Sequence, residues 1–141
     1  ASASSFGRMA FFFCCQQAAR LMKRQGSGRI VNLSSLGGIR PWAEHAHYCA
    51  SKAGVIMLTR ALSKAFAPAI TVNSVAPGPI DTEIMGGTLT DERKAQMSAD
   101  IPLGRVGTVQ DVAALLTFLM SEDAGYITAA TYDVNGGLQI S

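Results

Sequence analysis

The sequence predicts an α/β fold in which helices cover a parallel β-sheet. Two observations support it: short, β-branched apolar segments alternate with helical ones, and a helix between successive strands is the connection that parallel strands require. The composition agrees, because 48% of the 141 residues are hydrophobic and 16% are charged. That content suits one domain with a buried core.

The first helix is expected over residues 8–25, with basic residues near its C-terminal end and Gly26 as its stop. Cations interact favourably with that end of the helix dipole, and glycine is the usual residue just beyond it. Residues 29–34 then form a short apolar strand. Gly37-Gly38 and Pro41 predict a loop after it.

The second helix is expected over residues 44–67 and ends before Pro68. Small and aliphatic residues recur in it at helical spacing, which predicts a close-packing face: Ala46, Ala50, Ala53, Met57, Ala61 and Ala65. Residues 70–75 form a second buried strand, closed by the turn at residues 76–79.

The last part of the chain predicts helical stretches over residues 91–99 and 109–120, then a short strand over residues 131–134. Thr108 and Asp111 have the spacing of a capping box at the start of the second stretch. The complete order therefore gives three strands, with helices in each connection.

The charge balance and the cysteines restrict the class of protein. Twelve basic and ten acidic residues give a formal charge of +2, too small and scattered to predict a nucleic-acid or membrane partner. The apolar run at residues 11–15 is far shorter than the ~20 residues that span a bilayer. Cys14, Cys15 and Cys49 lack the spacing of a metal site. We expect no metal, and reduced thiols in a cytoplasmic protein.

Tyr48 and Lys52 are four residues apart on the second helix, so their side chains share one face. An unperturbed tyrosine has a pKa of about 10, and a nearby ammonium group lowers it. Tyr48 could then act as a general acid or base. Ser35 follows the first strand and would project into the crevice where open α/β sheets bind ligands. The spacing of Tyr48 and Lys52 taken alone is more often that of an exposed pair.

Three segments together are more specific than that pair: residues 32–35, 48–54 and 72–78. In this order and spacing they closely resemble the short-chain dehydrogenase/reductase family, in its 3-oxoacyl-carrier-protein-reductase-like or glucose-dehydrogenase-like form. Residues 101–105 and 133–137 also resemble that family's C-terminal segments. The resemblance implies that residues 1–141 are a single partial domain, the C-terminal part of a Rossmann-like doubly wound parallel sheet whose nucleotide-binding half is absent.

The resemblance also implies roles for individual residues. Ser35 would position the substrate oxygen, Tyr48 would be the acid/base, and Lys52 would lower the Tyr48 pKa and bind the nicotinamide ribose. Ser34 is the less expected catalyst of the two serines, because the family's active serine lies 13 residues before the tyrosine. The residues implied to bind the cofactor are Tyr48, Lys52, Pro77, Gly78, Ile80 and Thr82.

The implied activity is an NAD(P)-dependent oxidoreductase that interconverts a small carbonyl and alcohol substrate pair, with the choice between NAD and NADP left open. The resemblance further implies a homo-oligomer, a dimer or tetramer, built through the helices at residues 8–25 and 44–67. Met85, Leu89 and Met97 suggest an apolar lid over the substrate.

Two departures support an alternative, a truncated and catalytically silent fragment or pseudoenzyme that acts only through oligomer contacts. The chain has no glycine-rich phosphate-binding turn after an initial strand, and Arg8 aligns where the family has an asparagine of its proton relay. The strand at residues 29–34 would also leave an apolar sheet edge unpaired, which predicts a marginal or associating fragment.

Overall fold

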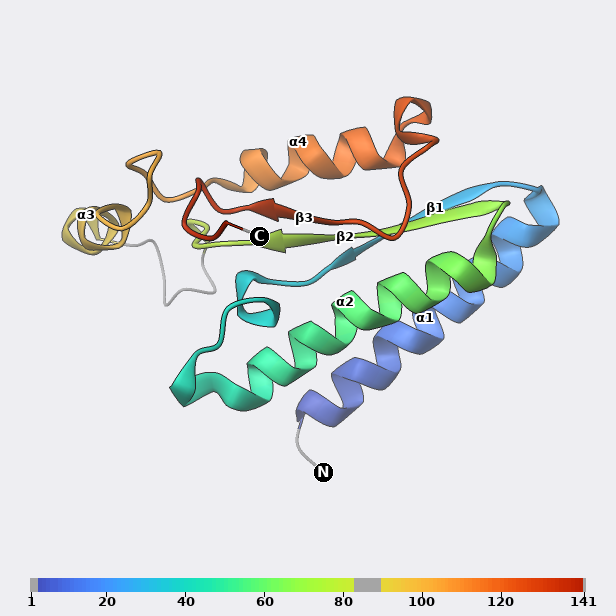
Figure 1. The fold of residues 1–141 in the computed structure, drawn as a ribbon, viewed down its shortest axis with the longest axis horizontal. Helices are drawn as coiled ribbons and strands as arrows, with labels where there is room; N and C mark the ends of the chain where they lie inside the picture. Colours follow the sequence, from blue (N-terminus) through green and yellow to red (C-terminus); the bar gives the residue numbers. More distant parts are fainter. Residues whose placement is uncertain (1–2, 83–89, 141) are drawn as a thin grey trace.

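A computed structural model describes residues 3–82 and 90–140, with side chains from residue 10 onward. Helices α1 and α2 cover one face of a three-stranded sheet and α4 covers the other (Figure 1). The elements in chain order are α1 (Ala3–Gln25), β1 (Gly28–Leu33), η1 (Leu36–Gly38), η2 (Ala43–His45), α2 (Ala46–Phe66), β2 (Ile70–Pro77), α3 (Asp91–Ser98), α4 (Val109–Met120), η4 (Glu122–Ala124) and β3 (Thr131–Val134).

The sheet is parallel, in the order β1-β2-β3. Gly28 lies opposite Ile70 and Leu33 lies opposite Val75, so β1 and β2 run in step toward their carboxyl ends. Parallel neighbours need a crossover connection, and α2 provides it between these two strands. The α/β, Rossmann-like fold class predicted from the sequence is confirmed.

The core consists of two apolar layers, one on each face of the sheet. Successive side chains of a strand point to opposite faces, so Ile30 packs toward α1 and α2 while Val31 packs toward α4. The buried members of the first layer are Cys15, Ala19, Ile30, Leu62, Ile70 and Val72. Those of the second layer are Val75, Val112, Leu119 and Ala124.

A buried chain of polar contacts crosses the first layer and joins three elements. The Cys15 thiol donates to Asn32 Oδ1 over 3.4 Å, and Asn32 Nδ2 donates to Thr59 Oγ1 over 3.0 Å. Thr59 in turn donates to the Val55 carbonyl over 2.9 Å. A buried polar group is costly unless it is hydrogen-bonded. This series of hydrogen bonds therefore fixes how α1 and α2 pack against β1.

Most of the predicted elements occur, with shifted bounds. Helix α4, strand β3 and the capping box of Thr108 and Asp111 match the prediction. Helix α1 begins at Ala3, five residues before the predicted start at residue 8, and β2 continues to Pro77. Residues 43–45 form a 3-10 turn, so α2 begins at Ala46 and not at residue 44.

Strand β1 lies at an edge of the sheet, as predicted. Within residues 3–82 and 90–140, β2 is the strand that pairs with it, and its other side has no neighbouring strand. No helix in these same ranges is long and apolar enough to cross a bilayer.

We predict that Thr59→Val destabilises the protein by about 1–3 kcal/mol, because it leaves the Asn32 amide buried without its partner. Urea denaturation would measure the loss. The same substitution at the exposed Thr117 of α4 is the control and should change stability by less than about 0.5 kcal/mol. Equal effects at the two positions would contradict the assigned role of the buried contact.

Candidate active site

A cavity of about 400 Å³ opens where the carboxyl ends of β1 and β2 meet the start of α2 and of α4. Open α/β sheets bind ligands beyond the carboxyl ends of their strands. The cavity is lined by all the residues that the sequence assigned to catalysis or cofactor binding, namely Ser35, Tyr48, Lys52, Pro77, Gly78, Ile80 and Thr82. Its remaining lining is mostly apolar: Leu33, Ser34, Val109, Val112, Ala113 and Leu116.

Ser35 is held by the turn that follows β1. It is the N-cap of η1, and its Oγ accepts a hydrogen bond from the Gly37 amide over 3.2 Å. The side chain is buried against the cavity wall. Because the hydroxyl acts as acceptor toward Gly37, its own proton remains to be donated to an oxygen in the cavity.

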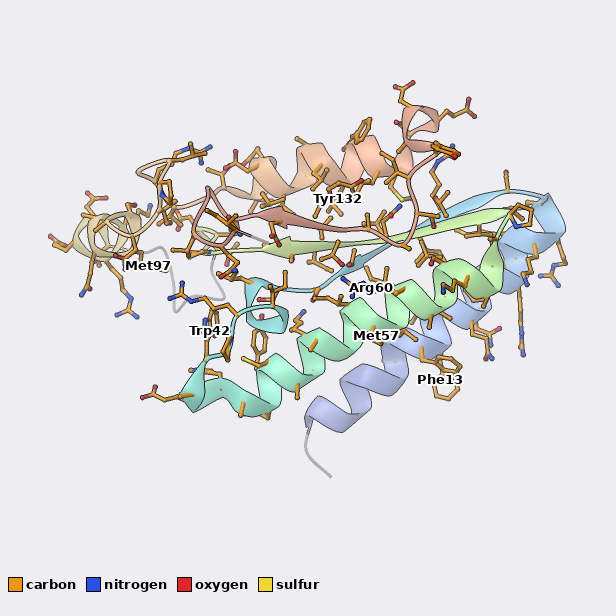
Figure 2. All side chains as sticks on the ribbon, viewed as in Figure 1. Phe13, Trp42, Met57, Arg60, Met97 and Tyr132 are labelled. Atoms are coloured by element: carbon orange, nitrogen blue, oxygen red, sulfur yellow. The ribbon has the colours of Figure 1, made fainter. Side chains whose placement is uncertain are left out.

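The Tyr48 ring contacts both the loop before α2 and the turn after β1. Trp42, on the loop before α2 (Figure 2), stacks on it with ring centroids 6.0 Å apart and an interplanar angle of 10°. On the side of η1 the backbone of Gly37 approaches closely, because a Cβ at that position would lie 2.9 Å from Tyr48 Cε1. A side chain at residue 37 would displace the ring. The stacking of Trp42 on Tyr48 was not predicted from the sequence.

Lys52 brings an ammonium group to the same cavity. Its Nζ donates to the Leu33 carbonyl over 3.1 Å and lies 5.8 Å from the centroid of the Tyr48 ring. Burial lowers the pKa of Lys52, because removal from water penalises the charged form. A partly desolvated cation interacts more strongly with a neighbouring group than an exposed one does.

The turn after β2 forms the floor of the cavity. The Gly78 amide donates to the Val134 carbonyl over 2.9 Å, and a Cβ on Gly78 would lie 2.7 Å from Asn135 Cβ. Glycine is thus required by the close approach of the Asn135 side chain. Residues 79–81 then pair with Gly107. The Gly107 amide donates to the Pro79 carbonyl over 3.0 Å, and the Asp81 amide donates to the Gly107 carbonyl over 2.9 Å.

Asp111 anchors this pairing from the first turn of α4. Its carboxylate accepts from the Thr108 amide over 2.7 Å and from Arg105 over 2.7 and 2.9 Å. These hydrogen bonds, those of the Arg105 guanidinium first, hold the pKa of Asp111 well below its usual range. The sequence predicted the capping box but not its support of the Pro79–Asp81 turn, which depends on the contacts of Gly107.

Some residues named from the sequence do not join this cavity. Met97 lies on α3 and is absent from the lining that the described residues form (Figure 2). Met85 and Leu89 fall outside the described residues. Arg8 is part of α1, and its side chain is outside the described part of the chain.

The family described as Enoyl-(Acyl carrier protein) reductase matches residues 4–139 of the chain. A solved structure, the short-chain dehydrogenase/reductase SDR:Glucose/ribitol dehydrogenase from Brucella melitensis, is 37% identical with a TM-score of 0.75. The matched region covers 80% of this chain and 46% of the chain in that structure.

The chain belongs to the short-chain dehydrogenase/reductase family. It is 46% identical over 123 residues to a 3-oxoacyl-[acyl-carrier-protein] reductase FabG from Haemophilus influenzae, covering 86% of this chain and 50% of that protein. A protein of the same name from Staphylococcus aureus is 48% identical over 128 residues, 90% of this chain and 52% of that protein. The chain thus spans about half the length of these curated relatives.

The cavity of this family member has the donor set that the nicotinamide end of a dinucleotide needs. Lys52, Tyr48 and Thr82 place an ammonium group and two hydroxyls around it, groups that hydrogen-bond ribose hydroxyls and a carboxamide. Leu33, Ile80 and Val112 supply an apolar wall beside them, and small-molecule sites combine such walls with a few polar groups. The lining residues are therefore chemically compatible with the nicotinamide end of such a dinucleotide.

We predict that Asp111→Asn lowers the melting temperature at neutral pH and that this difference shrinks in acid. A folded-state pKa held below the unfolded value stabilises the protein above the unfolded pKa of about 3.9, and the stabilisation is lost as pH falls through the folded value. Calorimetry from pH 7 down to acid would measure it.

Glu122→Gln, in η4 beyond the other end of α4, is the control because it removes one charge without touching the capping box. A difference between wild type and Asp111→Asn that stays constant through acid pH would contradict the assigned role of the Asp111 carboxylate.

Proposed function

We propose that this chain supplies the proton-transfer part of an NAD(P)-dependent oxidoreductase that interconverts a carbonyl and an alcohol. The supporting observation is the shared cavity, in which Ser35 from the end of β1 and Tyr48 and Lys52 from α2 meet. These three side chains combine a free donor, an acid/base group and a cation, the groups that carbonyl reduction needs.

In the proposed mechanism Ser35 donates a hydrogen bond to the substrate oxygen and orients it. Tyr48 gives its phenolic proton to that oxygen when the carbonyl is reduced and takes it back when the alcohol is oxidised. Lys52 stabilises the phenolate electrostatically from the partly desolvated position described above. Bound nicotinamide supplies or accepts the hydride. Tyr48, Lys52, Pro77, Gly78, Ile80 and Thr82 would hold it.

We further propose that the substrate is a 3-oxoacyl thioester. The two relatives named as 3-oxoacyl-[acyl-carrier-protein] reductases are 46% and 48% identical to this chain. The apolar side of the cavity, with Val109, Val112 and Leu116 of α4, suits an acyl chain.

We also propose that the protein is a homo-oligomer of the cytoplasm. Exposed apolar side chains of α1 and α2 support association, among them Phe13, which points away from the sheet (Figure 2), Leu21 and Met57. Apolar surface of this kind marks contact sites. Cys14, Cys15 and Cys49 are free, as in a reducing compartment.

We predict that Tyr48→Phe lowers kcat by at least about 100-fold, because it removes the group that transfers the proton. The assay follows NADH or NADPH consumption by the full-length protein with acetoacetyl-coenzyme A as the 3-oxoacyl thioester. Tyr126→Phe is the matched control, since Tyr126 is fully exposed and outside the cavity.

Unchanged turnover in Tyr48→Phe would contradict the assigned proton donor. A wild-type protein that consumes neither cofactor and binds neither would instead support the catalytically silent alternative.

A further inference from the structure

Two residues at the end of β1 contact Lys52 at both its main chain and its side chain. The Ser34 hydroxyl donates to the Lys52 carbonyl over 2.8 Å. In the opposite direction, Lys52 Nζ donates to the Leu33 carbonyl over 3.1 Å. Ser34 is 3% exposed, and its hydrogen bond to the Lys52 carbonyl is part-buried at the wall of the cavity.

The bond from Ser34 is additional to what the helix itself requires. In an α-helix the carbonyl of residue 52 is the acceptor for the amide of Ile56, so the Lys52 carbonyl needs no partner from outside α2. A second hydrogen bond from β1 instead ties one turn of α2 to the end of the strand. That turn carries Lys52, with Tyr48 one turn earlier.

The loop after Ser34 packs against the same turn. A Cβ at Gly38 would lie 2.8 Å from the Lys52 carbonyl carbon and 2.9 Å from its oxygen. Gly38 and the Ser34 hydroxyl thus both contact the Lys52 peptide group.

We propose that Ser34 is a positioning residue that fixes the Lys52 backbone against β1, so that the Lys52 ammonium group reaches the Leu33 carbonyl beside Tyr48. The inference rests on the proposed function, in which Lys52 assists Tyr48. The adjacent serines then have separate tasks: Ser35 faces substrate, and Ser34 holds the helix that carries the other two side chains. A displacement of about 1 Å in a reacting group can cost about 100-fold in rate.

The chain offers a matched control on the same helix. The Ser63 hydroxyl donates to the Arg60 carbonyl over 2.8 Å, and Ser63 is also 3% exposed. Ser63 lies outside the residues that line the cavity. Ser34→Ala and Ser63→Ala each remove a part-buried hydrogen bond from a serine hydroxyl to a carbonyl of α2. The Ser34 bond joins α2 to the end of β1 at the cavity, whereas the Ser63 bond is local to the helix and away from the cavity.

The test measures the pKa of Lys52 in the full-length protein by NMR of labelled lysine, together with kcat and KM. In Ser34→Ala the Lys52 amine gains access to water, so its pKa should rise toward the ordinary value of about 10.4. We expect kcat to fall at least about tenfold while KM for acetoacetyl-coenzyme A stays within about twofold. Ser63→Ala should change neither the Lys52 pKa nor kcat. Ser34→Thr keeps a hydroxyl, so its Lys52 pKa and kcat should be close to those of the wild type.

A Ser34→Ala protein whose Lys52 pKa and kcat equal those of Ser63→Ala would overturn the proposal, even if its stability has dropped. If Ser34→Ala does not fold, Ser34→Cys against Ser63→Cys carries the same comparison, since the thiol leaves no cavity and is a weaker donor than the hydroxyl. The Lys52 pKa is read without turnover, so an inactive wild type would refute the proposed function while this measurement still decides the role of Ser34.

Discussion

The junction between β1 and α2 is the contact on which the rest of the site depends. Asn32 bonds Thr59 in the core, and Ser34 bonds the Lys52 carbonyl at the cavity. Both contacts are polar; the first is buried and the second is part-buried, and an unpaired polar group away from water is costly. A helix that packed through apolar contacts alone could slide or rotate at lower cost. The hydrogen bonds set one position of α2, and the position of α2 sets where Tyr48 and Lys52 lie.

The side of the cavity formed by the turn after β2 is held by a helix cap. The turn after β2 pairs with Gly107, and Gly107 precedes the capping box that begins α4. A helix cap therefore supports both the start of α4 and the turn proposed to hold the nicotinamide. The cavity lies between a wall set by buried hydrogen bonds and a wall set by an exposed ion pair, so we expect the second wall to respond more to acid and salt.

The sequence predicted the elements better than their contacts. The bounds of α4 and the capping box followed from local spacing, and the approach of Ser35 to Tyr48 and Lys52 followed from the resemblance and from the parallel-sheet geometry. The role of Ser34 could not be predicted, because it depends on the direction its hydroxyl takes where β1 leaves the sheet. The 3-10 turn at Leu36–Gly38 was missed for a similar reason: paired glycines indicate a loop, and the contacts of Tyr48 and Lys52 then decide its path.

The cavity at the carboxyl ends of β1 and β2 is proposed to receive the nicotinamide end of the cofactor. Methyl NMR of the full-length protein, titrated with NADH and then NADPH, tests it most directly. We expect shifts at the methyl groups of Ile80 and Thr82, which line the cavity, and none at Met57, which is exposed on α2 outside it. The absence of binding, or binding that leaves the signals of Ile80 and Thr82 unchanged, would show that this cavity does not receive the nicotinamide.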